Sequence, residues 1–313
     1  MKSTTARRIG LCAAVAAALT TVAACGSSGS GKAAGTAGQG VTRVSPVAAL
    51  RSAETSTDRA DSARVDGTTT IGSMVSMKAQ GTLGWGSGLT GRLTLTYTGG
   101  TMAETMRRAA GITSMEARYL PDAYYAHMSD TFAARAGGGR HWLRYGYDDL
   151  GRLGGGSGAY LKDQLRNTTP NQSVKLLLAS GDVKKAGEAT VRGEHTTHYA
   201  GTVDVAGLAT RTSLLPKSQL DQLKQQLTQA GVTTERVDIW INDRNLLVKK
   251  VEKADMTAGT MTSTAYYSDY GTKVSVTAPP AGDTRDFKDL MKSQGTVTGG
   301  TGTGTGTGTG AGS

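Results

Sequence analysis

The thiol of Cys25 is the side chain whose neighbours specify its chemistry most closely. It follows Val22-Ala23-Ala24, which puts an aliphatic residue three positions before the cysteine and two small residues directly before it. A lipoprotein signal peptidase needs this pattern, because small residues must fit a narrow site beside a diacylated thiol. The pattern predicts that Cys25 is acylated and becomes the first residue of the mature protein.

The 24 residues before Cys25 have the organisation of a secretory signal peptide. Lys2, Arg7 and Arg8 form a positive region, and the apolar run Ile9 to Leu19 follows it. This run is too short for a comfortable membrane span. An ordinary secretory peptide and a retained membrane helix are the alternatives. Two or more acyl chains give stable attachment, so we expect a protein anchored by lipid at the extracytoplasmic face of the cell membrane.

Two further groups have the residue types of a metal or acid–base site but an unsuitable spacing. His195 and His198 form an H-x-x-H pair, but residues three apart on a strand point to opposite faces. We expect His195 to be partly buried and His198 to be exposed. Asp238 and Asp243 flank a predicted turn and would lie about 15 Å apart along a strand. Neither group favours a metal site or a catalytic pair.

Motif searches also favour a protein without catalytic residues. The glycine cluster 154–158 lacks the lysine and the hydroxyl residue of a phosphate-binding loop. The chain has no nucleophile-elbow, zinc-protease or EF-hand pattern. We therefore predict a protein that is not an enzyme and needs no cofactor or metal, with a cell-wall hydrolase as the remaining enzymatic alternative.

Composition restricts the partners. The formal charge is +10, and removal of the signal peptide leaves about +7, which suits anionic phospholipids or wall polymers, although it could serve solubility alone. Export argues against nucleic acid. The chain has 44 glycines but only two phenylalanines, together with ten methionines, which adapt to apolar ligands of varied shape. An interior that side chains fill incompletely would be a binding site for lipid.

The predicted organisation is one folded body between flexible ends. We expect a linker over 25–43, a lipid-binding domain over 44–290, and a disordered Thr-Gly-rich tail over 291–313. Helices are predicted at 45–62, from a capping box at Thr101 and Glu104, at 170–180 and at 216–230.

Alternating strands fill most of the rest of the domain, including a long strand at 188–205 and a last one at 273–278. Strands and helices do not alternate regularly, which favours an α+β fold: a single large curved antiparallel sheet (half-barrel) with helices on its concave face. Two smaller sheets are the alternative. Alternation alone suggests that these residues line a ligand cavity: Leu93, Leu95, Tyr97, Val203, Val205, Ile239 and Ile241.

Three segments carry a family resemblance beside the cysteine motif. They are Gly193-Glu-His-Thr-Thr-His-Tyr199, Val237-Asp-Ile-Trp-Ile-Asn-Asp243, and Tyr266-Tyr-Ser-Asp-Tyr-Gly271 running into Ala278-Pro-Pro280. With them the chain resembles actinobacterial lipoproteins of the LppX/LprG type, which share a half-barrel with the LolA and LolB carriers.

The resemblance implies a cavity for acyl chains and a role in carrying or chaperoning lipids or glycolipids in the cell envelope. The alternative is a sensor of the same fold that acts on a membrane protein partner, such as a kinase or an anti-sigma factor.

Overall fold

The computed structural model describes residues 45–152, 162, 165, 169–207, 217–256 and 259–298. Cys25, the signal peptide, the linker, the glycine cluster 154–158 and the end of the tail lie outside the described residues. Residues 44–313 form one compact unit, to which all the elements below belong.

Twelve strands of the described chain form one continuous open sheet. Its spatial order is β12-β6-β5-β4-β3-β2-β1-β11-β10-β9-β8-β7. The strands are β1 Ser62–Ile71, β2 Val75–Gly84, β3 Thr90–Gly99, β4 Ser114–Tyr119, β5 Ala123–His127, β6 Trp142–Gly146, β7 Lys184–Val191, β8 Glu194–Asp204, β9 Val232–Asn242, β10 Leu247–Met256, β11 Gly259–Ser268 and β12 Thr284–Asp286. The predicted single large sheet is confirmed.

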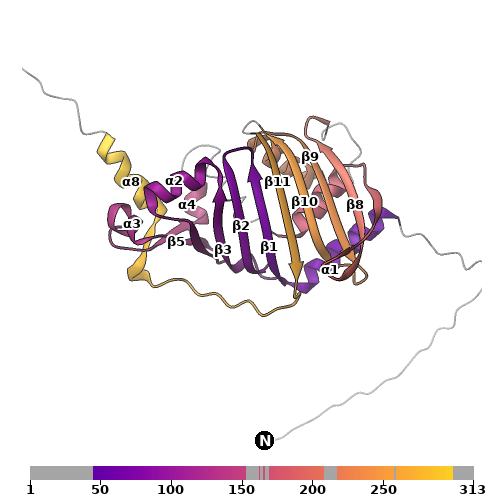
Figure 1. Cartoon of the computed structure of the whole chain (residues 1–313), viewed down its shortest axis with the longest axis horizontal. Helices are drawn as coiled ribbons and strands as arrows, with labels where there is room; N and C mark the ends of the chain where they lie inside the picture. Colours follow the sequence, from indigo (N-terminus) through magenta and orange to yellow (C-terminus); the bar gives the residue numbers. More distant parts are fainter. Residues whose placement is uncertain are drawn as a thin grey trace, which may run out of the picture. The chain divides into compact units, whose positions relative to one another are not determined.

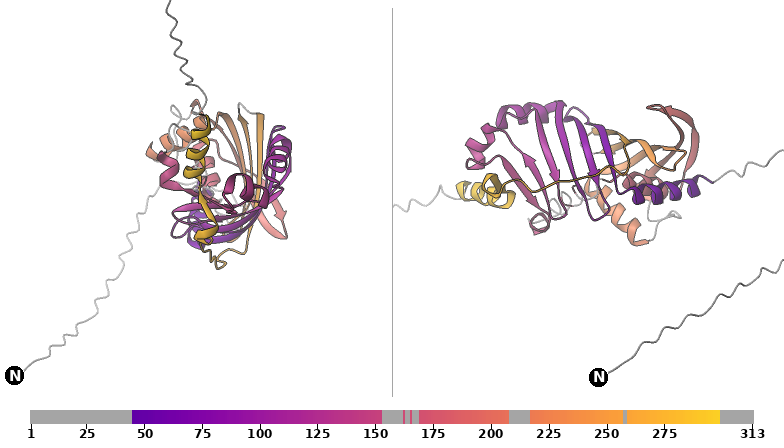
Figure 2. Two further views of the ribbon diagram at one scale, coloured as in Figure 1. Left: turned by 90° about the vertical axis from the view of Figure 1, so that its left-hand side faces the viewer. Right: turned by 90° about the horizontal axis from the view of Figure 1, so that it is seen from below.

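Two meanders build this sheet and meet at its centre. Strands β1 to β6 extend to one side and β7 to β11 to the other, and β1 pairs with β11 over Arg64–Ser268 to Ile71–Met261 (Figure 1). Pairs such as Gly67–Ala265 join residues almost 200 positions apart, so the centre of the sheet depends on contacts that the local sequence does not specify. The sheet is bent, as Figure 2 shows.

The sheet is mixed, because its edge strand β12 runs parallel to β6. After β11 the chain crosses along one rim of the sheet to reach the opposite edge (Figure 1). The predicted strand at 273–278 belongs to this crossing and forms no ladder; Arg118 Nη1 donates to the carbonyl of Thr277 at 3.1 Å. The expectation of a purely antiparallel sheet is thus wrong at this edge.

Helices α6 (Asn171–Ala179) and α7 (Lys217–Gln229) cover the inner, concave face of the second meander. Helix α6 packs on β8 and β9, and α7 on β9. Helix α1 (Pro46–Ala60) packs against α6, and the side-chain amide of Asn171 donates to Asp58. Leu50, Leu177 and Ile239 are fully buried in this core. The shorter helices are α3 Asp130–Phe132, η1 Ala133–Gly137, α4 Tyr147–Arg152 and η3 Ala281–Asp283.

Helix ends follow their sequence signals in some places and not in others. The hydroxyl of Ser45 accepts from the backbone N–H of Ala48, and Pro46 takes the first helical position of α1 as predicted. Helix α2 (Gly100–Ala110) begins without a side-chain cap, so the predicted capping box is wrong. Helix α8 (Phe287–Thr298) extends into the predicted tail, because residues 291–298 are helical.

The strand predicted at 188–205 is a hairpin. Strands β7 and β8 are joined at Arg192 and Gly193, both of which have positive φ (50° and 87°). Two consecutive residues with positive φ match the right-handed twist of the flanking strands in a tight hairpin turn, and glycine adopts this conformation at little cost.

Candidate functional site

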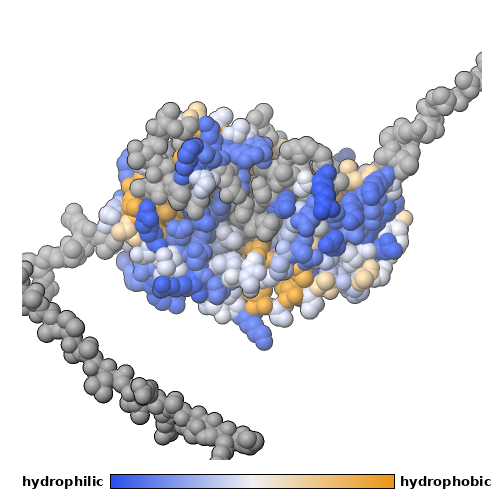
Figure 3. Space-filling view, turned by 180° about the vertical axis from the view of Figure 1, so that it is seen from behind, coloured by the Kyte–Doolittle hydropathy of each residue, from blue (hydrophilic) through white to orange (hydrophobic). Residues whose placement is uncertain are grey.

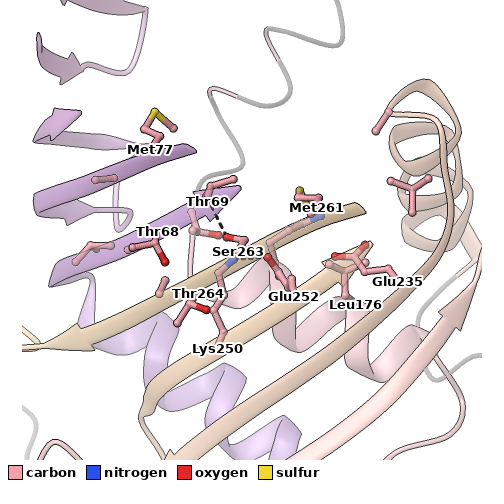
Figure 4. A pocket seen from close by; sticks show the side chains of 18 of the residues that line it. Thr68, Thr69, Met77, Leu176, Glu235, Lys250, Glu252, Met261, Ser263 and Thr264 are labelled. Atoms are coloured by element: carbon pink, nitrogen blue, oxygen red, sulfur yellow. Dashed lines mark hydrogen bonds and ion pairs between the residues drawn. The ribbon is translucent and has the colours of Figure 1, made fainter. Parts of the chain in front are cut away.

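A cavity of about 440 Å³ lies between the inner face of the sheet and helices α6 and α7. This volume is within the range of small-molecule sites and roughly three times that of an engineered cavity that holds benzene. Its walls come from β1, β2, β3, β9, β10 and β11 and from the two helices (Figure 4). The exterior seen in Figure 3 is mostly hydrophilic, with hydrophobic atoms gathered in a few places.

The cavity exists because neighbouring strands present small side chains at the centre of the sheet. Ala79, Gly67 and Ala265 follow one another across β2, β1 and β11 in the register of the sheet. In the next row, Thr69 is followed by Ser263, with their hydroxyls 3.4 Å apart. Larger residues at these positions would fill the space under α7. The incompletely filled interior expected from the glycine and phenylalanine content agrees with this geometry.

Apolar and flexible side chains surround this space. Leu176 of α6 and Leu223 and Leu227 of α7 face the strands, and methionines lie among the strand residues. The residues of the cavity wall include Val65, Met77, Leu83, Leu93, Leu176, Leu223, Leu227, Val232, Met256, Met261 and Tyr267. Such a lining suits an apolar molecule, and methionine side chains can adjust to its shape.

Two oppositely charged side chains enter this cavity from β10. The ammonium of Lys250 lies 2.9 Å from one carboxylate oxygen of Glu252, whose other oxygen accepts from the hydroxyl of Ser173 on α6. Burial opposes the charge on Lys250, but the Glu252 carboxylate outweighs it, and the pKa of Lys250 is raised. Lys250 and Glu252 thus form a charge-neutral pair in the wall of the cavity.

Glu235 is a second carboxyl group in the same wall. It lies on β9 and is only 3% exposed. Its neighbours across the ladder are Val203 on β8 and Ala254 on β10, neither of which can neutralise a charge. Burial raises the pKa of Glu235 to about 8, the charge of Glu252 adds to this effect and Lys250 opposes it. At neutral pH the group is mainly an uncharged carboxylic acid.

The structure brings one of the seven predicted cavity residues to this cavity. Leu93 is part of its wall. The other six point to the inner face but lie elsewhere in the interior: Leu95, Val203, Val205, Ile239 and Ile241 are buried in the main core, and Tyr97 is half-buried beside the smaller core under α2. Helix α6 packs on β8 and β9 and occupies the space that the alternation pattern left open there.

Sequence reasoning missed the polar members of the site, although the same alternation contains them. Ile239 and Ile241 were expected to point inward, and two steps of two residues back from Ile239 reach Glu235. Lys250 and Glu252 share one face of β10 in the same way. Charged residues at inward positions of a strand were the available signal.

The two histidines are exposed in the reverse of the expected order. His195 is 54% exposed beside the hairpin turn, where its Nδ1 lies 3.0 Å from Asp243, and this hydrogen bond raises its pKa. His198 is 21% exposed, because it pairs with Asp238 at 2.8 Å and stacks on Trp240 with ring centroids 4.2 Å apart. His195 is the second residue of β8 and directly follows the turn at Arg192 and Gly193, so its side chain lies at the exposed end of the hairpin.

Comparison with known proteins places the chain in a family. It is 54% identical over 261 residues to an uncharacterized 31.2 kDa protein in the rplA-rplJ intergenic region of Streptomyces griseus, which covers 83% of this chain and 85% of that protein. It is 50% identical over 313 residues to a Streptomyces coelicolor protein named "putative lipoprotein", which covers 95% of this chain and all of that protein. The chain belongs to this family of Streptomyces lipoproteins. No protein-family model matches the chain.

Two solved mycobacterial structures are similar to this chain. LprF from Mycobacterium bovis is 14% identical with a TM-score of 0.46, covering 75% of this chain and 97% of that one. LppX from Mycobacterium tuberculosis is 15% identical with a TM-score of 0.45, covering 74% and 98%. The Streptomyces relatives confirm the expected resemblance to actinobacterial lipoproteins. In the described ranges no helix is long and apolar enough to cross a membrane, and no group of three or more metal-ligating side chains occurs there.

Proposed function

We propose that this lipoprotein binds a lipid or glycolipid through a hydrocarbon chain in the cavity, as a carrier or chaperone in the cell envelope. The observation that supports this proposal is the 440 Å³ space bounded by Leu176, Leu223 and Leu227 on one side and by small strand residues on the other. Transfer of a methylene group from water to such a site contributes about 0.8 kcal/mol. Several buried methylenes would supply the affinity, and the proposal includes no catalytic step.

In the same proposal, acylated Cys25 anchors the mature protein at the extracytoplasmic face of the cell membrane. The sequence up to Cys25 supports this anchoring, and the name of the Streptomyces coelicolor relative agrees with it. The linker over 25–43 would let the domain over 44–290 reach a ligand away from its anchor. Cys25→Ala should release the protein from the membrane fraction, whereas Cys12→Ala, which changes a residue of the signal peptide, should not.

The test of ligand binding is mass spectrometry of lipids that co-purify with the full-length protein from its native envelope. Ser263→Leu puts a leucine on the cavity face of β11, and its neighbour Thr262→Leu puts a leucine on the opposite face. We expect the wild type and Thr262→Leu to carry an acyl lipid and Ser263→Leu to carry much less. Repeated absence of any acyl species from the wild type would contradict the proposal. A stoichiometric membrane protein without lipid would point to the sensor alternative.

A further inference from the structure

The carboxyl group of Glu235 has no hydrogen-bond partner among the described residues, although it is 97% buried and lines the cavity. Buried polar groups in proteins almost always have a partner, and a lost one costs about 1–3 kcal/mol. Glu252, on the neighbouring strand, already binds Lys250 and Ser173. The oxygens of Glu235 are not among the fully enclosed unpaired atoms, so they face the space of the cavity, where a partner would come from outside the described chain.

The carboxyl group of Glu235 lies beside the apolar part of the cavity. Met261, Ala254, Glu235 and Val203 form one row across β11, β10, β9 and β8. Figure 4 shows Glu235, Glu252 and Met261 projecting on the same side of the sheet. A molecule whose hydrocarbon chain lies among the methionines and leucines would bring its polar end to this row.

The charges around the cavity determine whether the polar group of a bound ligand can be charged. The titratable groups that face Glu235 in the cavity are Glu252 and Lys250 of β10 and Tyr267 of β11, while α6 and α7 contribute the uncharged Gln172 and Gln226. Lys250 and Glu252 neutralise each other at 2.9 Å, so the wall has no unpaired positive charge among its described residues. An anionic group would have to leave water without a counter-ion, whereas an uncharged acceptor would not.

Resting on the function proposed above, we infer that Glu235 is the polar recognition group of the cavity. It donates a hydrogen bond from its uncharged carboxyl to a neutral carbonyl, and the preferred ligand is an uncharged acyl ester and not a free fatty acid. The Lys250–Glu252 pair keeps the surroundings electrically neutral and leaves Glu235 as the available donor. Ser173 contributes by holding Glu252 from the helix side.

The experiment compares two probes that differ only at the polar end, palmitic acid and methyl palmitate. Each is added to full-length protein in non-ionic detergent, and native mass spectrometry gives the bound fraction. The variants are Glu235→Leu, which removes the donor, Glu235→Gln, which keeps one, and Glu188→Leu, the same change as the first at an exposed site on β7. Circular dichroism checks that each variant is folded.

We expect the wild type, Glu235→Gln and Glu188→Leu to prefer the ester at pH 7 by roughly three- to tenfold, the range of one net hydrogen bond. Glu235→Leu should lose this preference. Raising the pH to 9 should weaken ester binding to the wild type, because an ionised carboxylate has no proton to donate, and should leave Glu235→Gln unchanged.

The outcomes separate this inference from the function on which it rests. If both probes bind equally well and Glu235→Leu does not alter their binding, the role of Glu235 is overturned and an apolar-ligand site remains. A preference for the acid that Glu235→Leu abolishes would overturn the choice of a neutral ligand. If neither probe binds to any variant, both this inference and the proposed function fail.

Discussion

The ammonium of Lys250 and the carboxylate of Glu252 are 2.9 Å apart on the cavity face of β10, two residues from each other along one strand. Their side chains are 16% and 9% exposed, so both charges have left water. Desolvation of this kind is costly, and a pair of this kind adds little stability over an apolar replacement. Its effect on folding becomes visible when only one partner is removed.

Glu252→Gln should reduce the free energy of unfolding by about 3–5 kcal/mol, because it leaves the Lys250 ammonium buried without a counter-ion. The double variant Lys250→Met/Glu252→Leu should lose much less, since no buried charge remains. Urea denaturation monitored by circular dichroism measures both. The surface pair Lys217–Asp221 is the control, with Lys217 87% exposed, and Lys217→Met should cost under about 1 kcal/mol. A double variant no more stable than Glu252→Gln would contradict this account.

The raised pKa of Glu235 predicts the direction in which the free energy of unfolding changes with pH. Its pKa of about 8 in the folded chain lies above the value near 4.3 expected for an unfolded glutamate. Between these values the folded state binds a proton that the unfolded state does not, so the group's contribution to stability is present at low pH and falls as pH rises. The slope approaches about 1.4 kcal/mol per pH unit.

The measurement is the difference in free energy of unfolding between Glu235→Gln and the wild type at pH 5, 6.5 and 8. Glutamine does not titrate, so the variant should gain stability relative to the wild type with each increase in pH. Glu188→Gln, at an exposed carboxylate that Lys185 contacts at 2.7 Å, should not show this trend. A difference that stays constant over the three pH values would show that Glu235 does not bind the extra proton.

The inner and outer faces of individual strands were predictable because alternation is a local property. Leu93, Val203, Ile239 and Ile241 all point inward as the period of two indicates. Helices α1, α6 and α7 were predictable as well, since their apolar spacing and a proline at or directly before the first residue mark them in the sequence.

The location of the cavity was not predictable in the same way. It depends on the pairing of β1 with β11, which brings Gly67 beside Ala265, and on the placement of α6 over β8 and β9. Both are long-range contacts without a local signal. Likewise, Arg192 gave no indication of positive φ, so the end of β7 and the whole of β8 were interpreted as one strand.

Gly81 on β2 lies where the backbone of the neighbouring strand β3 leaves no room for a side chain. Its φ is 155°, and a Cβ at this position would clash with the carbonyl oxygen of Arg92 on β3. Gly81→Ala must therefore move two paired backbones apart, and we expect it to cost at least about 2 kcal/mol. Gly282→Ala is the matched control, because nothing lies within 4 Å of its Cβ. Thermal unfolding compares the two, and equal melting temperatures would refute the steric argument.

Arg144 on β6 holds the edge strand that precedes the C-terminal helix. Its guanidinium contacts Asp286 of β12 at 2.9 Å, Asp122 at 3.3 Å and Asp149 at 3.8 Å. Because β12 pairs with β6 over three residues only, these contacts carry much of its attachment. Arg144→Met should cost about 1.5–3 kcal/mol in the local opening of β12, seen as faster amide exchange over residues 284–298. Arg92→Met removes a more exposed guanidinium that pairs with Glu116 on the outer face, and exchange at 284–298 should then stay as in the wild type.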